Sequence, residues 1–333
     1  MLKIAIIGCG AIGQDHIRRL INIVPGCVVT GCSDYVSELA KKTADKFGIE
    51  YFSSGEELIH SDNVDAVLIA SSDESHAGYV LECIKAKKYV FCEKPLSHNV
   101  EGCEKILTEE VRFGKPLVQV GFMRRYDPGY AEMKRIIDSG ELGAPLIIHA
   151  AHRNVSQPAG YTTDMAVSNS GIHELDICRW LLNEEYSHGQ VLKVRQSSCS
   201  DKTYDNPQIV LLQTESGARI DVELQLSDAY GYDIQCQVVC EKGTIDLPEP
   251  TSPVIRTNAR RCTPILTDWK ERFVEAYDLE MIDWVEGVKR ENLNGPSSWD
   301  GYAACVAAET LNQSRDSGLF VPINMQKKPA MYD

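Results

Sequence analysis

Features that would place a protein in a membrane or on nucleic acid are missing from this chain of 333 residues. No apolar run approaches the roughly 18 residues that cross a bilayer. Residues 1–8 lead straight into a strand pattern and lack the basic region and long apolar stretch of a signal peptide. Positive charge is scarce, and a net charge of −14 disfavours nucleic acid and anionic membranes as partners. We therefore expect a cytoplasmic protein that binds neither.

Paired cysteine motifs are also missing, although the chain has 12 cysteines. None belongs to a CxxC pair, and many lie inside strand or helix patterns, which suits buried, reduced thiols better than disulfides. Cys236 and Cys240 have the spacing that places two side chains on one face of a strand, but they lack the further ligands of a zinc site. The sequence therefore predicts no metal site.

The chain does contain an alternation of apolar strand patterns with helical patterns over residues 1–121. The predicted strands are 3–7, 28–32, 66–70, 89–92 and 117–120, and the predicted helices are 11–23, 36–47, 75–87 and 100–113. Strands rich in β-branched residues that alternate with helices indicate a parallel sheet covered on both faces. We therefore predict an α/β protein whose first domain is a Rossmann-type dinucleotide-binding domain.

Residues 122–333 predict a second, α+β domain. A predicted strand at 145–154 and a predicted helix at 168–180 come first. Four strand patterns with short turns follow, at 190–199, 208–215, 218–226 and 233–240. Two helical patterns, at 270–290 and 300–316, close the chain. Consecutive strands with short turns predict a large, mainly antiparallel open sheet. Because such a sheet must bury one face on helices or on another copy, we expect a homo-oligomer.

A glycine-rich turn, Gly8-Cys9-Gly10-Ala11-Ile12-Gly13, follows the first strand and opens the first helix, which is the context that a dinucleotide-binding GxGxxG requires. Gly8 permits the tight turn, Gly10 lets the backbone approach a pyrophosphate, and Gly13 allows close packing of helix on strand. The amide groups of the first turn, Ala11 and Ile12 among them, then favour phosphate.

The second strand ends at Asp34, 21 residues after Gly13. A carboxylate there accepts hydrogen bonds from ribose hydroxyls and repels a 2′-phosphate, and Tyr35 stands where an arginine would otherwise hold that phosphate. The sequence therefore predicts NAD as cofactor in preference to NADP. The alternative for Asp34 is a solvated turn residue.

Two later strands of the first domain end in polar residues. Ser71 and Ser72 follow one strand and are placed to line the cofactor. His76 starts the next helix, where it either caps the helix or contacts the cofactor. The next strand ends in Glu93-Lys94-Pro95. Ligands of open α/β sheets bind at the carboxyl ends of the strands, so the Lys94 ammonium is placed to polarise a substrate oxygen, the alternative being a surface lysine.

The second domain offers a candidate general base. Asn169, His173 and Asp176 share one face of the predicted helix 168–180, and a histidine flanked by polar groups has the pKa and the orienting partners that a base needs. A histidine satisfied within a packed helix is the alternative. Arg124, His152 and Asn154 together make donors and acceptors for a polyol, although each singly fits a surface position. Tyr232 fits either the substrate or the core.

The glycine-rich turn, Asp34, residues 71–76 and above all Glu93-Lys94-Pro95 resemble, in this order and spacing, the glucose–fructose oxidoreductase, inositol dehydrogenase and MocA (Gfo/Idh/MocA) family. The likeness covers essentially the whole chain, and residues 152–154, 161–167, 173–176 and 299–302 are similar to the bacterial inositol dehydrogenases of that family. The resemblance implies a cytoplasmic homotetramer that oxidises a secondary hydroxyl of a cyclic polyol, myo-inositol to 2-keto-myo-inositol above all, with NAD.

The resemblance also implies roles for residues. His173 accepts the hydroxyl proton, Lys94 stabilises charge on the reacting oxygen, and hydride passes to C4 of the nicotinamide. Residue 169 completes the catalytic set. Glu93 and Lys94 lie beside the cofactor, and the implied substrate pocket consists of Lys94, Met123, Arg124, His152, Asn154, Asn169, Ser170, His173 and Tyr232.

The chain departs from the family pattern at Asn169, where an aspartate is usual four residues before the histidine. An amide still forms hydrogen bonds but carries no charge, so we expect a lower pKa for His173 than beside a carboxylate. Another inositol isomer, sugar or glycoside therefore stays open as substrate, as does a sensor without catalysis, which intact Lys94 and His173 disfavour. The sequence leaves the isomer, the physiological direction and the strictness of NAD preference undetermined.

Overall fold

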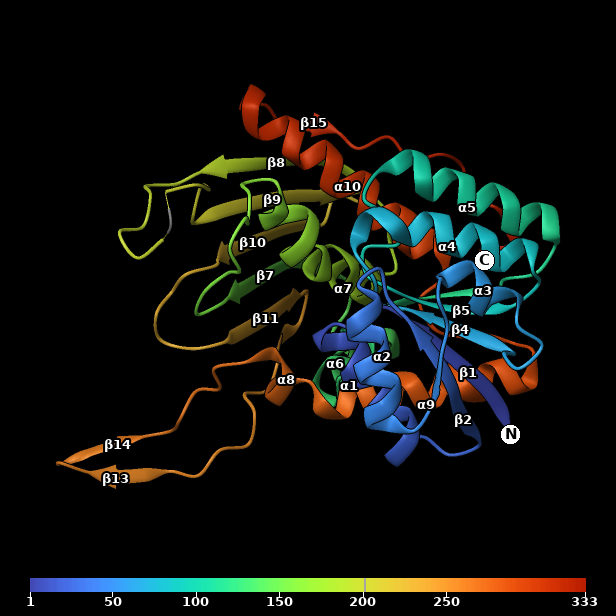
Figure 1. The fold of residues 1–333 in the computed structure, drawn as a ribbon. Coiled ribbons are helices and arrows are strands. Elements are labelled where there is room, and N and C mark those ends of the chain that lie inside the picture. Colours follow the sequence, from blue (N-terminus) through green and yellow to red (C-terminus); the bar gives the residue numbers. More distant parts are fainter. Residues whose placement is uncertain (201) are drawn as a thin grey trace. The chain divides into compact units, whose positions relative to one another are not determined.

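The computed structural model describes residues 1–200 and 202–333, and the chain divides into two compact units (Figure 1). The first unit comprises Met1–Met123, Tyr277–Cys305 and Met325–Asp333. The second comprises Arg124–Ala276 and Val306–Asn324. The predicted boundary after residue 121 lies within two residues of the first change of unit. A single division into 1–121 and 122–333, however, does not describe the later chain, because two C-terminal segments belong to the first unit.

The reason for this difference lies in the packing of helix α9 (Val274–Arg290). The Trp284 indole meets the ring of Phe91 edge to face, with 5.5 Å between the ring centroids. Met281, Val285 and Val288 belong to the same buried core as Ile4 and Ile6 of the first strand. Apolar residues from the end of the chain therefore complete a core that residues 1–121 do not fill by themselves.

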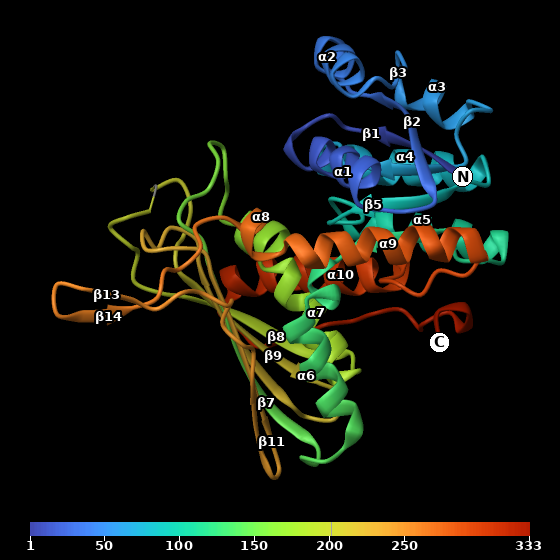
Figure 2. The same cartoon turned by 90° about the horizontal axis from the view of Figure 1, so that it is seen from below.

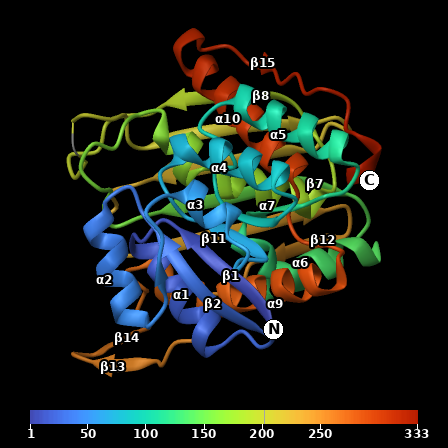
Figure 3. The same ribbon diagram turned by 45° about the vertical axis from the view of Figure 1, so that its right-hand side comes forward.

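The first unit is built on a six-stranded parallel sheet with the order β3-β2-β1-β4-β5-β6, which is the Rossmann order. Its strands are β1 (Leu2–Ile7), β2 (Cys27–Ser33), β3 (Glu50–Tyr51), β4 (Ala66–Ile69), β5 (Tyr89–Glu93) and β6 (Val118–Gly121). Its helices are α1 (Ala11–Asn22), α2 (Ser37–Phe47), α3 (Gly55–His60), α4 (Asp73–Lys85) and α5 (Val100–Phe113), with α4 packed beside α5 (Figure 3). The predicted α/β fold is confirmed, and only β3 and α3 were missed.

The central strands explain why the pattern was readable. All four residues of β4 are buried, as expected for a strand covered on both faces.

The C-terminal part of the chain adds α9, the helix α10 (Ser298–Ser317) and a final 3₁₀ turn, η3 (Ala330–Tyr332). Among the described residues, no helix combines the length and the apolar composition that a bilayer crossing requires.

The second unit contains a seven-stranded sheet with the order β12-β11-β7-β10-β9-β8-β15, in which only the β7–β10 pair is parallel. The prediction of a mainly antiparallel sheet is therefore confirmed. The strands are β7 (Pro145–Arg153), β8 (Tyr186–Lys193), β9 (Gln208–Thr214), β10 (Arg219–Gln225), β11 (Asp233–Cys240), β12 (Gly243–Asp246) and β15 (Val321–Pro322). The strand predicted at 190–199 begins and ends earlier, as β8.

Shorter elements flank this sheet. They are η1 (Met123–Tyr126), α6 (Pro128–Ser139), η2 (Ala166–Ser170), α7 (Ile172–Leu182), the hairpin β13–β14 (Ile255–Thr257 and Arg260–Cys262) and α8 (Trp269–Arg272). The side chains of β7 alternate, with Ile148, Ala150 and His152 buried and Ile147 and His149 exposed on the opposite face. One face of the sheet therefore joins the core and the other is open.

The segment predicted as one helix over 168–180 is two elements. Residues Ala166–Ser170 form a π-helical turn, closed by the hydrogen bond from the Gly171 N–H to the Ala166 carbonyl oxygen at 2.8 Å, and α7 begins only at Ile172. A π turn holds one residue more than an α turn, so the continuous α-helix predicted over 168–180 is replaced by a π turn up to Ser170. This part of the helix prediction was wrong.

Candidate active site

The glycine-rich turn has the shape of a phosphate cradle. Gly8 lies at φ +104°, and a Cβ there would overlap the carbonyl oxygen of Ala70, while a Cβ at Gly13 would overlap the carbonyl oxygen of Gly8. Only glycine fits either position. Gly10, the N-cap of α1, has open space at its Cβ position and makes no side-chain cap. The first-turn amides are thus suited to bind the phosphates of a dinucleotide.

Asp34 is fixed beside this turn. Its Oδ2 accepts a hydrogen bond from the Cys9 N–H at 2.7 Å, and its Oδ1 accepts one from the Val36 N–H at 2.8 Å. Each carboxylate oxygen has a second lone pair, so the group can still receive ribose hydroxyls. Tyr35 is fully exposed next to it. The residues present therefore fit a bound NAD.

Glu93 forms contacts within the first unit. It is buried, and its Oε1 lies 2.7 Å from Nε2 of buried His16 on α1, while its Oε2 accepts a hydrogen bond from the Lys94 N–H at 3.2 Å. The carboxylate thus links His16 to the Lys94 backbone inside the first unit, and its expected contact with the cofactor stays a prediction. Lys94 itself is half-buried and joined to Pro95 by a cis peptide bond.

His76 supports the same turn. Its Nδ1 lies 2.7 Å from the Pro95 carbonyl oxygen and its Nε2 lies 3.3 Å from the Ser71 carbonyl oxygen. The histidine is buried and both ring nitrogens face backbone carbonyls, so it does not cap the helix, while its contact with the cofactor stays a prediction. It links the ends of β4 and β5. The Ser71 hydroxyl bonds to that of Ser75 at 2.7 Å, and Ser72 is the N-cap of α4.

In the second unit, five side chains from four separate segments of the sequence form one polar cluster. Arg124 is 1% exposed and forms an ion pair with Glu174. The other Glu174 oxygen lies 2.8 Å from Nδ1 of His152, whose Nε2 lies 3.1 Å from the Asn154 side-chain oxygen. The ring of Tyr232 meets the His152 ring edge to face, with 6.0 Å between the centroids. The predicted polyol residues of this unit are thus brought together.

The charges in this polar cluster compensate one another. Burial alone would raise the pKa of Glu174, but Arg124 and His152 outweigh it and lower that pKa. Burial opposes the charge of Arg124, and the Glu174 carboxylate reverses this and raises the guanidinium pKa. Burial raises the pKa of Tyr232 to about 12, so its hydroxyl is neutral at pH 7. The Arg124–Glu174 ion pair therefore lies beside further donors and acceptors, the neutral Tyr232 hydroxyl among them, which suits a polyhydroxyl ligand.

Asp176, which the sequence placed on the same helix face as His173, forms a pair with Arg125. Its two oxygens accept hydrogen bonds from Nε and an Nη of Arg125, at 2.9 and 2.5 Å, and the carboxylate is buried. This bidentate pair ties η1 to α7. Asp127 caps α6 through its Oδ1, and its Oδ2 receives Arg272 at 2.6 Å. The Arg125–Asp176 pair therefore fixes η1, which contains Arg124, against α7.

The candidate base and its neighbours lie at the start of α7. His173 is 8% exposed, and Asn169 is half-buried in the π-helical turn. The Ser170 hydroxyl is 2.6 Å from that of Tyr161, which also donates to the Met165 carbonyl oxygen at 2.7 Å. Met123, the remaining predicted substrate residue, is buried in the first unit. His173 thus follows a widened turn that fixes the backbone before it.

Sequence reasoning missed two residues. Glu174 was seen only as part of a motif, and its contacts with Arg124 and His152 were not predicted. His16 was not considered, although it lies on the helix that the glycine-rich turn opens. A signal was present in both cases, because a charged or titratable residue in an otherwise apolar helix face needs a partner.

Comparisons with known proteins match the whole chain. Residues 2–122 match the model of the oxidoreductase family with an NAD-binding Rossmann fold, and residues 134–324 match that of its C-terminal alpha/beta domain. The chain is 49% identical over 333 residues to an inositol 2-dehydrogenase of Burkholderia lata, covering 99% of each. It is 48% identical to an inositol 2-dehydrogenase of Pseudomonas savastanoi pv. phaseolicola, covering 100% of this chain and 99% of the relative.

A solved structure agrees with these relatives. The myo-inositol dehydrogenase from Lactobacillus casei, crystallised with NAD(H) and myo-inositol, has a TM-score of 0.97 and 34% identity over all of both chains. The glycine-rich turn, the fixed Asp34 and the two-unit fold agree with the family models in both halves of the sequence. The chain therefore belongs to the Gfo/Idh/MocA family of oxidoreductases, and its first unit carries the family's NAD-binding Rossmann domain.

Proposed function

We propose that the chain is an NAD-dependent dehydrogenase that oxidises a secondary hydroxyl of a cyclic polyol, with myo-inositol as substrate and 2-keto-myo-inositol as product. The observation that carries the proposal is the buried polar cluster of the second unit, in which the Arg124–Glu174 ion pair lies beside the donors and acceptors of His152, Asn154 and Tyr232. Full-length relatives that are named inositol 2-dehydrogenase support the same substrate.

His173 is proposed as the general base that takes the proton of the reacting hydroxyl. Lys94 is proposed to stabilise negative charge as it develops on the same oxygen, and Asn169 to hold that oxygen or the base by hydrogen bonds. NAD, when bound, supplies the hydride acceptor. The chain contributes the positions of the reacting groups and the electrostatic field around them. Groups that are already held in place lose less entropy on reaching the transition state.

The polar cluster is proposed to set specificity. His152, Asn154 and Tyr232 offer hydrogen bonds to the hydroxyls that do not react, while Arg124, already paired with Glu174, positions His152 rather than carrying a free charge. A site built on such bonds rejects analogues that lack a hydroxyl, since its own polar groups would then stay unpaired. Met123 and Ser170 complete the proposed substrate set.

NAD is proposed as the physiological cofactor in preference to NADP. The support is Asp34, whose carboxylate is fixed by two backbone amides beside the phosphate cradle and would repel a 2′-phosphate. We also propose a homotetramer in the cytoplasm. All twelve cysteines are free thiols, which suits a reducing compartment, and the open face of the seven-stranded sheet offers a surface for association.

The test is NADH formation by the purified chain with myo-inositol, scyllo-inositol, D-chiro-inositol, glucose and xylose, each with NAD and with NADP. The proposal predicts the highest kcat/KM for myo-inositol with NAD. Highest activity with another of these compounds would replace the substrate but keep the reaction. Absence of reduced cofactor with every polyol would overturn the proposed function, and preference for NADP would overturn the role of Asp34.

A further inference from the structure

Two buried histidines hold the segment that carries Lys94, one on each side of the lysine. On one side, Nε2 of His16 lies 2.7 Å from Oε1 of Glu93, whose Oε2 accepts the Lys94 N–H at 3.2 Å. On the other side, Nδ1 of His76 lies 2.7 Å from the carbonyl oxygen of Pro95. The backbone is therefore bonded at Lys94 itself and again one residue later.

His16 reaches Glu93 from helix α1, which lies against the parallel sheet of the first unit (Figure 2). Its side chain is fully buried, and its ring meets those of Phe91 and Tyr277 edge to face, each with 5.8 Å between the ring centroids. Close packing against two aromatic rings leaves the imidazole little freedom to turn. His16 thus offers Glu93 a rigid partner.

The polar contacts of His16 lead to Glu93 alone. A carboxylate only accepts hydrogen bonds, so Nε2 of His16 is the donor in this pair. Nδ1 of the same ring is buried and has no hydrogen-bond partner among the described residues. Any polar role of this imidazole therefore passes through the Glu93 carboxylate.

The neighbouring strand leaves room for this carboxylate. Glu93 of β5 pairs with Gly121 of β6, and a Cβ at Gly121 would lie only 2.9 Å from Oε2 of Glu93. A side chain at this position would displace the oxygen that accepts the Lys94 N–H. The place of the Glu93 carboxylate thus depends on His16 at one oxygen and on the absence of a side chain beside the other.

We propose that His16 is a positioning residue for Lys94 and acts through the Glu93 carboxylate. The proposal rests on the role of Lys94 in the proposed function. Without the bond from His16, the Glu93 side chain is free to rotate, so Oε2 no longer stays at the Lys94 N–H. Because a misplacement of about 1 Å can lower a rate about 100-fold, the lysine then stabilises charge on the reacting oxygen less well.

The first test is a double-mutant cycle on the full chain with His16→Leu, Lys94→Met and both together. We expect His16→Leu alone to lower kcat by at least about 10-fold, with an unchanged dissociation constant for NADH. With Lys94→Met present, the same substitution should change kcat by less than about 2-fold, because the group that it positions is gone. An equal loss in both backgrounds is what a purely structural role gives, and it would overturn the proposal.

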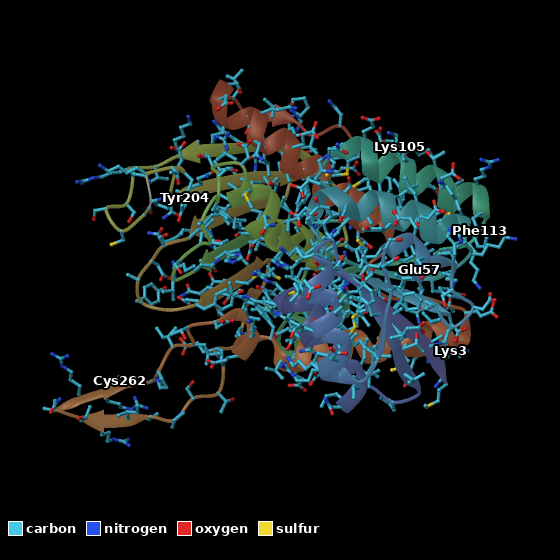
Figure 4. All side chains as sticks on the ribbon, in the orientation of Figure 1. Lys3, Glu57, Lys105, Phe113, Tyr204 and Cys262 are labelled. Atoms are coloured by element: carbon cyan, nitrogen blue, oxygen red, sulfur yellow. The ribbon has the colours of Figure 1, made fainter. Side chains whose placement is uncertain are left out.

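A conservative variant and a control accompany the cycle. His16→Gln keeps an N–H donor near the position of Nε2, so it should recover most of the kcat that His16→Leu loses. The control is His60→Leu, which breaks the exposed pair of His60 with Glu82, 2.9 Å apart. His60 ends α3, the helix that carries Glu57 in Figure 4. The control should keep the wild-type kcat, and a His16→Gln variant as slow as His16→Leu contradicts the proposal.

Crystal structures of the wild type and of His16→Leu test the positioning without turnover. We expect the Glu93 carboxylate and Nζ of Lys94 to move by about 1 Å or more, while α1 stays in place. Should His16→Leu not fold, Gly121→Ala displaces the same oxygen from β6 and serves instead. An unmoved Lys94 would overturn the proposal even if kcat fell. A wild type that oxidises no polyol would overturn the proposed function, and the crystal structures would still decide the role of His16.

Discussion

Replacing Glu174 by glutamine tests whether the polar cluster is held by a buried ion pair. The substitution keeps the shape of the side chain but removes the charge that compensates Arg124, whose side chain is 1% exposed. It also weakens the hydrogen bond to Nδ1 of His152, now 2.8 Å long. Breaking a buried pair by removing one partner costs about 3–5 kcal/mol, because an uncompensated charge stays behind. We expect a loss of that size in the free energy of unfolding.

The assay is urea unfolding at pH 7 with a matched control. Glu132→Gln makes the same substitution in an exposed pair, in which the side chains of Glu132 and Arg135 are 57% and 67% exposed. An exposed pair contributes about 0–1 kcal/mol, so this variant should unfold close to the wild type. Adding Arg124→Met to Glu174→Gln should recover part of the lost stability, since no buried charge then remains.

The pH dependence gives a second check with a defined sign. The pKa of Glu174 is lowered in the folded chain from its ordinary value of 4.5, so its contribution is complete above 4.5 and is lost as the pH falls through the lower folded value. The difference between wild type and Glu174→Gln should therefore shrink in acid. A difference below about 1 kcal/mol at pH 7, or one that does not shrink in acid, would refute the reasoning.

Three further predictions concern catalysis and cofactor binding. His173→Ala should lower kcat by about 100-fold or more while the dissociation constant for NADH, measured by fluorescence, stays unchanged; retained turnover would remove His173 as the base. Asn169→Asp should shift the acid limb of the pH–rate profile to higher pH, by on the order of one unit, because a nearby negative charge favours protonated histidine; an unmoved profile across all polyols contradicts this. Asp34→Ala should lower the ratio of kcat/KM with NAD to kcat/KM with NADP by about 10-fold or more. An unchanged ratio would show that Asp34 does not distinguish the ribose 2′-hydroxyl from a 2′-phosphate.

Much of the first unit was predictable because its signals are local. A strand buried on both faces is continuously apolar, as in β4, and a GxGxxG turn is recognisable since Gly8 and Gly13 lie where any side chain would overlap backbone. The antiparallel sheet of the second unit was likewise marked by strands of period two with short turns. In each case the residues that determine the structure lie within a few positions of one another.

The parts that were mispredicted depend on contacts between distant residues. The sequence could not show that α9 completes the first unit, because Trp284 and Phe91 are far apart in the chain. It also gave no sign that Arg124 pairs with Glu174 or that Glu93 pairs with His16, because these partners are far apart in the chain.

The sequence by itself determined the family, the dinucleotide turn and the identities of the candidate catalytic residues, because these depend on residue type and short spacing. Only the tertiary structure decided which polar residues compensate one another, because a buried charge is bound to whichever partner the fold brings within hydrogen-bonding distance. The π-helical turn before His173 was also decided by the tertiary structure. Its extra residue is fixed by the surrounding packing and produces no periodic pattern in the sequence.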